Sequence, residues 1–302
     1  MRDFSKYQGV IPAFYACYDD LGAVSATKVR ELTRYLIGKG VKGLYVGGSS
    51  GECIYQSVEE RKLVLENVMA EVGGKLTVIA HVACNNTLDS QELARHAESL
   101  KVDAIAAIPP IYFHLPPYGI AEYWNDISAA APNTDFIIYN IPQLAGVALT
   151  PELLAEMQKN PRVIGVKNSS MPTQDIQMWK DQGGPDFVVM NGPDEQFVSG
   201  LAMGATGGIG GTFAVMPELF LKVWGLFYAG KVAEAAAVQN DICRIIYKMC
   251  SAHGNLYAVV KAILKKHGCD IGSVRKPLPA LIDSDLTVVD EASAMIDAAI
   301  AK

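Results

Sequence analysis

The stretch RVIGVKNSS at residues 162–170 decides the predicted fold. Val163, Ile164 and Val166 form a short β-branched run without polar alternation, which is typical of a strand buried on both faces of a parallel sheet. Lys167 follows directly, at the carboxyl end of this run. The stretch therefore predicts a buried parallel strand with a primary amine at its mouth, and the amine needs an explanation.

Seven further apolar runs have the same character, and segments with helical spacing lie between them. The segment at residues 57–72 opens with Ser57 and Glu60 in capping-box register. Another segment begins with Thr150 as the expected N-cap and Pro151 at the first helical position. The seven runs are GVIPAFYAC from Gly9, GLYVGG from Gly43, TVIAHVA from Thr77, AIAAIPP from Ala104, DFIIYNIP from Asp135, FVVMNGPDE from Phe187 and GATGGIGG from Gly204.

Strand–helix alternation repeated eight times predicts a (β/α)8 barrel, the TIM barrel of the α/β class. A doubly wound open sheet is the structural alternative. After about residue 215 the pattern is helical to the end of the chain. We therefore expect a single domain over residues 1–302, with the barrel at 1–230 and a C-terminal helical appendix at 231–302.

Charge and composition exclude several classes of partner. The net charge is −6, and no basic cluster is longer than Lys265–Lys266, which argues against nucleic acid or an acidic membrane. The stretch MRDFSKYQGVIPAF lacks the apolar core of a signal peptide, and no apolar run reaches the ~18 residues of a membrane span. The six cysteines form no CxxC pair and the five histidines no metal-site spacing. We expect a cytoplasmic protein without a metal.

Lys167 and Tyr139 end neighbouring predicted strands, and each has two interpretations. Lys167 could be a snorkelling side chain with its ammonium in water. In an apolar barrel mouth it would instead be desolvated, which favours a neutral amine able to form a Schiff base with a ketone or aldehyde. Tyr139 could move protons beside it, or it could be a core tyrosine with a satisfied hydroxyl.

Three other strand ends carry polar or glycine-rich motifs. GGSSGE at residues 47–52 could turn its N–H groups, Ser49 and Ser50 toward a carboxylate or phosphate, but no Lys-Ser/Thr pair makes it a P-loop. Asp194 and Glu195 could bind a metal, act as acid and base, accept hydrogen bonds from sugar hydroxyls, or begin a helix. GGIGG at residues 207–211 resembles a dinucleotide loop only loosely, because no acidic residue is placed for a ribose.

Five of these motifs stand in the order and at the spacing of a known family. The chain resembles the pyruvate-dependent class I aldolases, which include dihydrodipicolinate synthase and N-acetylneuraminate lyase. The resemblance runs from GVIPAF to RKPLPAL, almost the whole chain. The motifs that carry it are GGSSGE, YNIPQLAGVALTPELL, GVKNSS, GPDEQF and GATGGIGG.

The resemblance implies a role for several strand-end residues. Lys167 would form a Schiff base with the keto carbon of pyruvate or of a 2-keto acid, and Tyr139 would be the proton shuttle. Ser49 and Ser50 would hold the carboxylate. Tyr112 resembles the tyrosine that completes a hydroxyl relay, often across a subunit contact. The resemblance also implies a homotetramer, and it makes pyruvate a substrate, so that we expect no separate cofactor.

The motif YNIPQLAG separates the branches of this family. Dihydrodipicolinate synthases typically carry an arginine two residues after the proline, for the second carboxylate of their aldehyde substrate, where this chain has Leu144. The form found here is similar to N-acetylneuraminate lyases. In those enzymes an Asp-Glu pair after a glycine binds the polyol tail of the sugar acid, and Gly192, Asp194 and Glu195 match it. Two carboxylates that accept from sugar hydroxyls would discriminate against substrates without them.

Some positions depart from the lyase pattern. Ser50 and Ser169 stand where lyases often have threonine, so a hydroxyl is kept at both. Gly211 stands where many lyases have serine, which leaves the exact sugar acid open. We expect Ser169, Gly210 and Gly211 to line the substrate.

The resemblance thus implies reversible cleavage of N-acetylneuraminate to N-acetylmannosamine and pyruvate. Alternatives within the family are an aldolase for another 2-keto-3-deoxy sugar acid and a dihydrodipicolinate synthase. Outside it stand a non-catalytic sugar-acid-binding protein on a barrel scaffold and a pyridoxal-phosphate enzyme. For the last, no Asp or Arg is placed as the partner of the ring nitrogen.

Overall fold

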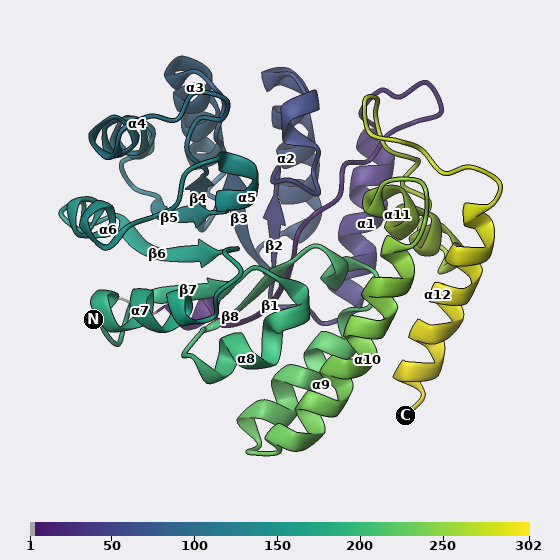
Figure 1. Cartoon of the computed structure of the whole chain (residues 1–302). Helices are drawn as coiled ribbons and strands as arrows, with labels where there is room; N and C mark the ends of the chain where they lie inside the picture. The colour runs from purple at the N-terminus through teal and green to yellow at the C-terminus, as the bar shows by residue number, and fades with distance from the viewer. Residues whose placement is uncertain (1–3) are drawn as a thin grey trace.

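The centre of the molecule is a barrel of parallel strands, described by a computed structural model that covers residues 4–302 (Figure 1). Residues 1–3, with which the predicted domain begins, lie outside the described residues. Within the described part, eight strands pair in the order β1-β8-β7-β6-β5-β4-β3-β2. Their bounds are β1 Gly9–Pro12, β2 Gly43–Val46, β3 Thr77–His81, β4 Ala104–Ala107, β5 Asp135–Asn140, β6 Val163–Asn168, β7 Val188–Asn191 and β8 Gly207–Gly210.

The two end strands of this order also meet. A parallel bridge joins Ala13, just after β1, to Tyr45 of β2. The N–H of Phe14 donates to the carbonyl of Tyr45 at 2.8 Å, and the N–H of Lys42 donates to the carbonyl of Val10 at 2.9 Å. The sheet therefore closes on itself, and the open-sheet alternative is wrong.

Helices follow every strand and surround the barrel, so the predicted (β/α)8 TIM barrel is confirmed (Figure 1). The helices are α1 Ala26–Gly38, α2 Val58–Val72, α3 Thr87–Ser99, α4 Pro117–Ala130, α5 Pro142–Ala145, α6 Pro151–Met157, α7 Gln174–Gly183, α8 Phe197–Ala202, α9 Pro217–Tyr228, α10 Val232–Cys250, α11 Leu256–Lys266 and α12 Asp285–Ile300. Short 3-10 turns are η1 Ser5–Tyr7, η2 Cys53–Tyr55, η3 Asp194–Gln196 and η4 Thr212–Ala214.

The predicted helix starts are confirmed in detail. The hydroxyl of Ser57 accepts from the N–H of Glu60, and the Glu60 carboxylate accepts from the N–H of Ser57, which is a complete capping box. Thr150 caps α6 by accepting from the N–H of Leu153, and Pro151 is the first residue of that helix.

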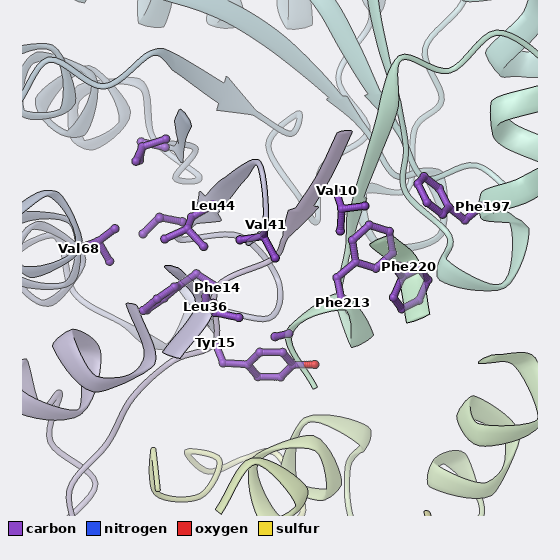
Figure 2. Packing of buried hydrophobic residues seen from close by; sticks show 14 of the residues in the cluster. Val10, Phe14, Tyr15, Leu36, Val41, Leu44, Val68, Phe197, Phe213 and Phe220 are labelled. Carbon is purple, nitrogen blue, oxygen red and sulfur yellow. The ribbon is translucent and has the colours of Figure 1, made fainter. Parts of the chain in front are cut away.

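The continuous apolar runs are explained by two cores that share the strands. Residues of an inner cluster fill the barrel, and residues of an outer cluster pack against the helices. Along β2, for example, Leu44 belongs to the outer cluster and Tyr45 to the inner one. Figure 2 shows part of the outer cluster, where the rings of Phe197, Phe213 and Phe220 lie together. Both faces of each strand are buried, so no polar alternation is left in the sequence.

One irregularity interrupts the pairing of β5 with β6. Phe136 of β5 pairs with Val163 of β6. The next residue of β5, Ile137, pairs with Gly165, so that Ile164 is an extra residue on β6. The position of Gly165 admits no side chain, because a Cβ there would lie 2.1 Å from the carbonyl oxygen of the neighbouring strand β7. Such a one-residue shift is a β-bulge, a device that re-aims the residues beyond it.

The shift decides the direction of Lys167. Ile164 belongs to the inner cluster and Val166 to the outer one. Lys167 therefore faces the barrel interior, in register with Tyr139 of β5 and Met190 of β7. Strict alternation from Ile164 would have turned Lys167 toward the helices.

The last three helices lie together beside the barrel, where α10 packs against α9 and α12 (Figure 1). The predicted boundary between residues 230 and 231 falls between α9 and α10. The division into barrel and appendix within one domain stays a prediction. From residue 4 onward, no helix combines the length and the apolar character needed to cross a membrane.

Candidate active site

A cavity of about 350 Å³ opens at the carboxyl ends of the strands. A second cavity of about 310 Å³ adjoins it and shares Ser49, Tyr139 and Leu144 with it. Of the predicted site residues, Gly210 and Tyr112 are not part of the lining. The predicted residues that line the first cavity are Ser49, Ser50, Tyr139, Lys167, Ser169, Gly192, Asp194, Glu195 and Gly211.

Lys167 is buried between two tyrosine rings, and the carboxylate of Asp194 lies near enough to act on it. The residue is only 4% exposed. The Nζ atom lies 3.9 Å from the ring centroid of Tyr139 and 4.0 Å from that of Tyr45. Burial lowers the pKa of Lys167, and the nearby Tyr139 opposes that change. The environment thus favours the neutral amine, which is the nucleophilic form.

The ring of Tyr139 is held by two edge-on neighbours. Its centroid lies 5.7 Å from that of Tyr45 and 6.0 Å from that of His81. The Nδ1 atom of His81 lies 2.9 Å from the carbonyl oxygen of Gly47. Burial lowers the pKa of His81 well below its usual value, so the ring is neutral and donates from Nδ1. A neutral imidazole adds no second positive charge beside Lys167.

Ser49 and Ser50 sit in a tight turn, residues 47–52, which we call the serine turn. The N–H of Glu52 donates to the carbonyl of Ser49 at 2.9 Å, and the N–H of Ala16 donates to the carbonyl of Ser50 at 3.1 Å. Gly47 has a positive φ of 76°, which glycine adopts without strain. Both serines line the cavity, and the side chain of Ser50 also interacts with the phenols of Tyr15 and Tyr257.

Ser169 and Gly192 fit against each other. A Cβ on Gly192 would lie 1.9 Å from the Oγ atom of Ser169, so the serine hydroxyl occupies the space that any larger residue would need. The N–H of Ser169 donates to the carbonyl of Asn140 at 2.7 Å. The end of β6 is therefore anchored to β5 directly beside Lys167.

Asp194 is buried at the start of η3 and is only partly engaged. Its Oδ2 atom accepts from the N–H and from the hydroxyl of Thr212, both at 2.6 Å. Its Oδ1 atom has no hydrogen-bond partner among the described residues. A Cβ on Gly210 would lie 2.1 Å from this Oδ1, so Gly210 makes room for the carboxylate instead of lining the cavity. Burial raises the pKa of Asp194 to about 6.

The two carboxylates of the Asp-Glu pair differ in their environment. Glu195 is exposed at the edge of the cavity, whereas Asp194 is buried within it. Glu195 can therefore reach a long ligand, whereas the Asp194 carboxylate is held in place by Thr212.

Tyr112 lies away from the cavity of its own chain. It is 85% exposed and has a positive φ of 83°, which is strained for a bulky residue. It stacks edge-on against Phe113 with centroids 5.0 Å apart, and both line a separate surface cavity of about 690 Å³.

Three lining residues, Tyr15, Thr212 and Tyr257, escaped the sequence analysis. So did Tyr45, whose ring packs against the Nζ atom of Lys167. Tyr45 could have been found, because it takes the inward position of GLYVGG when Leu44 and Val46 face the helices. Tyr257 comes from α11, far along the chain, and no local pattern points to the cavity.

The described residues also include no group of three or more His, Cys, Asp or Glu side chains placed to hold a metal ion.

Comparison with known sequences matches residues 6–295 to the model of the Dihydrodipicolinate synthetase family. The N-acetylneuraminate lyase of Mediterraneibacter gnavus is 68% identical over 297 residues, which cover 98% of this chain and 94% of that protein. The N-acetylneuraminate lyase of Salmonella agona is 36% identical over 277 residues, which cover 90% and 91%.

Solved structures also match this chain. A sialic acid aldolase from Ruminococcus gnavus, solved as a catalytic lysine mutant, matches with a TM-score of 0.98 and 68% identity, covering 99% of this chain and 98% of that one. A protein from Clostridium difficile, CdNal in complex with mannosamine, matches with a TM-score of 0.91 and 28% identity, covering 97% and 99%.

Proposed function

Since this chain belongs to the dihydrodipicolinate synthetase family, we propose that it catalyses the reversible cleavage of N-acetylneuraminate to N-acetylmannosamine and pyruvate. The observation that carries the proposal is the burial of the Lys167 amine between the rings of Tyr45 and Tyr139. The 68% identity to an N-acetylneuraminate lyase over almost the whole chain supports this substrate above other sugar acids.

The reaction begins with an imine on Lys167. The neutral amine attacks the keto carbon of the open-chain sugar acid and forms a carbinolamine, which loses water to leave a protonated Schiff base. The two aromatic rings beside Nζ help to bury the amine, and burial lowers its pKa, which favours the neutral form that attacks. The Tyr139 phenol, in register beside Lys167, carries the protons of these steps.

The protonated imine then accepts the electrons of the breaking bond. The hydroxyl on the carbon two positions beyond the imine carbon loses its proton. The bond from that carbon to the carbon next to the imine carbon then breaks, and N-acetylmannosamine leaves as the aldehyde. The enamine that remains takes a proton on carbon, and water releases pyruvate from Lys167. Tyr139 is the proton carrier that the cavity offers next to Nζ.

The binding roles follow from the lining of the cavity. The hydroxyls of Ser49 and Ser50 receive the carboxylate of the substrate, and Ser169 and Gly192 border the imine carbon. Asp194 and Glu195 read the hydroxyls of the polyol tail, with Gly210 and Gly211 leaving room beside them. The position of both carboxylates in the cavity lining supports this role.

We further propose a homotetramer in the cytoplasm. The exposed aromatic side chains of Tyr112, Phe113 and Tyr118 support a subunit contact, since a monomer would leave them in water. In such an assembly Tyr112 would complete a hydroxyl relay in the site of a neighbouring subunit. A gel-filtration mass four times that of the chain is expected, and a Tyr112→Phe variant should keep that mass while losing activity.

Borohydride trapping tests the imine. Reduction of the protein in the presence of N-acetylneuraminate should leave a pyruvyl adduct on the peptide that contains Lys167, and N-acetylmannosamine should appear when borohydride is left out. Lys167→Met, which keeps the volume without the amine, should give no adduct. An adduct from pyruvate with none from N-acetylneuraminate would retain the aldolase and reject this substrate. The absence of any adduct would reject the Schiff base altogether.

A further inference from the structure

The serine turn ends on Glu52, which does not line the 350 Å³ cavity and whose carboxylate is buried against α11. Glu52 has a positive φ of 51°, in the left-handed region that a glutamate seldom adopts. Its N–H closes the turn on the carbonyl of Ser49. The position of the Glu52 main chain therefore sets where Ser49 and Ser50 present their hydroxyls.

An ion pair holds the Glu52 side chain. Its Oε1 atom lies 2.7 Å from Nζ of Lys261 on α11, and both side chains are 0% exposed. Its Oε2 atom accepts from the N–H of Arg275 at 2.9 Å. Lys261 also donates to the carbonyl of Ser273 at 2.8 Å. One carboxylate thus ties the serine turn to α11 and to the segment 273–275.

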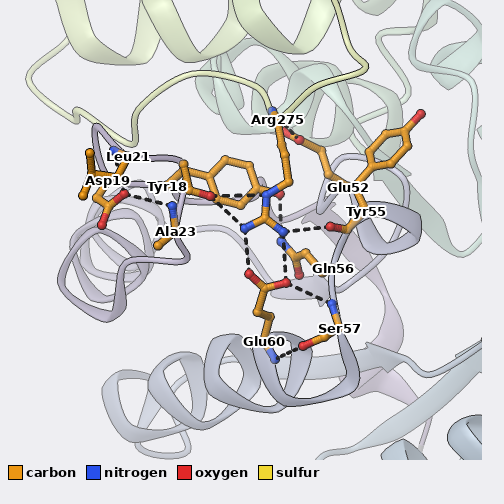
Figure 3. Close-up of polar contacts among 11 residues, drawn as sticks. Tyr18, Asp19, Leu21, Ala23, Glu52, Tyr55, Gln56, Ser57, Glu60 and Arg275 are labelled. Atoms are coloured by element: carbon orange, nitrogen blue, oxygen red, sulfur yellow. Dashed lines mark hydrogen bonds and ion pairs between the residues drawn. The ribbon is translucent and has the colours of Figure 1, made fainter.

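Arg275, whose N–H binds Glu52, is itself held by several contacts. The Arg275 guanidinium binds both carboxylate oxygens of Glu60, at 2.9 and 2.6 Å, and donates to the carbonyl of Tyr55 at 2.7 Å (Figure 3). It also lies 4.5 Å from the ring centroid of Tyr18. A bidentate guanidinium pair fixes both distance and direction. The segment that holds Glu52 is therefore fastened to the start of α2.

Stability alone gives a poor account of a fully buried ion pair. The cost of removing two charges from water roughly cancels their attraction, and apolar residues of similar volume stabilise a protein as well or better. What the pair provides is direction, because its hydrogen bonds allow one placement of the Glu52 side chain. An apolar contact is not directional and would allow the serine turn to take several positions.

We propose that Glu52 and Lys261 are positioning residues, which hold the serine turn in the geometry that receives the carboxylate of pyruvate. The C-terminal helices are then part of the substrate site through α11. This inference rests on the proposed function, in which Ser49 and Ser50 bind that carboxylate, and it assigns no contact with substrate to Glu52 or Lys261.

The test is the double variant Glu52→Gln/Lys261→Met, which removes both charges and leaves neither unpaired. Glutamine keeps the length of Glu52 and can still accept from the N–H of Arg275. We expect the KM for pyruvate in the condensation direction to rise about tenfold or more, since a hydrogen bond to a carboxylate is weakened. The melting temperature should change little, and saturating pyruvate should still be trapped on Lys167.

The matched control is Asp285→Asn. Asp285 is a buried carboxylate of the C-terminal helices, to which Lys261 also belongs. It accepts hydrogen bonds from the N–H groups of His253, Gly254 and Ile282. Its loss should lower the melting temperature and leave the KM for pyruvate unchanged. A rise in that KM for Asp285→Asn equal to that of the double variant would overturn the proposal, because general loosening would explain both.

A second variant covers the case in which the double variant does not fold. Glu52→Asp keeps both charges but draws the carboxylate back by one methylene, so it should fold and raise the KM for pyruvate. A folded Glu52→Asp or double variant with the wild-type KM overturns the proposal. Wild-type protein that traps no pyruvate rejects the proposed function itself, whereas wild-type trapping with unchanged variants rejects the positioning role alone.

Discussion

Replacing Gly165 by alanine should disable Lys167 without touching it. A Cβ at Gly165 would lie 2.1 Å from the carbonyl oxygen and 2.7 Å from the Cβ of Val188 on β7. Ordinary contacts between such atoms need about 3.5 Å, so one of the strands must move by more than about 1 Å. The paired strand has no flexible side-chain end to give way, because the contact is with its backbone.

The magnitude follows from two effects of that movement. Inserting one methyl group into a packed interior costs about 1–3 kcal/mol, so the melting temperature should fall by several degrees. A displacement of about 1 Å at a reacting group costs on the order of 100-fold in rate. We expect the rate of pyruvate trapping on Lys167 to fall about 100-fold in protein that is still folded at room temperature.

The assay is timed borohydride trapping, read by mass spectrometry alongside circular dichroism of the same sample. Gly225→Ala is the control: Gly225 is exposed on α9 with no atom within 4 Å of a new Cβ, so it should keep the trapping rate and gain up to about 1 kcal/mol of stability. A folded Gly165→Ala protein with the wild-type trapping rate would refute the claim that the register shift aims Lys167.

Two further predictions concern the part of the site that reads the substrate. The pKa of Asp194 is raised to about 6, so between about pH 4 and pH 6 the folded protein holds a proton that the unfolded chain releases, and stability falls as the pH rises through this window. Asp194→Asn removes this loss. In denaturant titrations, the free energy of unfolding of the variant should therefore rise by about 3 kcal/mol relative to that of the wild type between about pH 4 and pH 7. Equal pH dependence of the two proteins would contradict the burial argument. Leu144 lines the cavity and is 60% exposed, so Leu144→Arg needs no burial of charge. This variant should lose activity on N-acetylneuraminate and accept aldehydes that carry a carboxylate in condensation with pyruvate, and no gain on such aldehydes would speak against a specificity role for this position.

The fold could be predicted because the strands are buried on both faces. Eight apolar runs separated by helical segments leave few possible architectures. Closure could not be read from the pattern, since it depends on the contact between Ala13 and Tyr45. The capping box at Ser57 was predictable because all its atoms belong to four consecutive residues.

The site was predictable in its residues more than in their environments. Most of the residues predicted from strand-end motifs line the cavity. The inward direction of Lys167, however, depends on an extra residue, Ile164, that only the pairing with β5 reveals. Asp194 and Glu195 are adjacent in the sequence, which does not indicate that the first is buried and bound by Thr212 while the second is exposed. The roles of these residues stay predictions.

The residues of the site differ in how freely they can be changed. Lys167 and Tyr139 belong to paired strands, where a change disturbs the neighbours on both sides. Leu144 and Glu195 lie on short helical turns at the rim and are exposed. Mutational libraries confined to the rim can therefore explore new aldehyde partners while the bond-making amine is inherited unchanged, and a single scaffold can serve as the starting point for a series of carbon–carbon bond-forming catalysts.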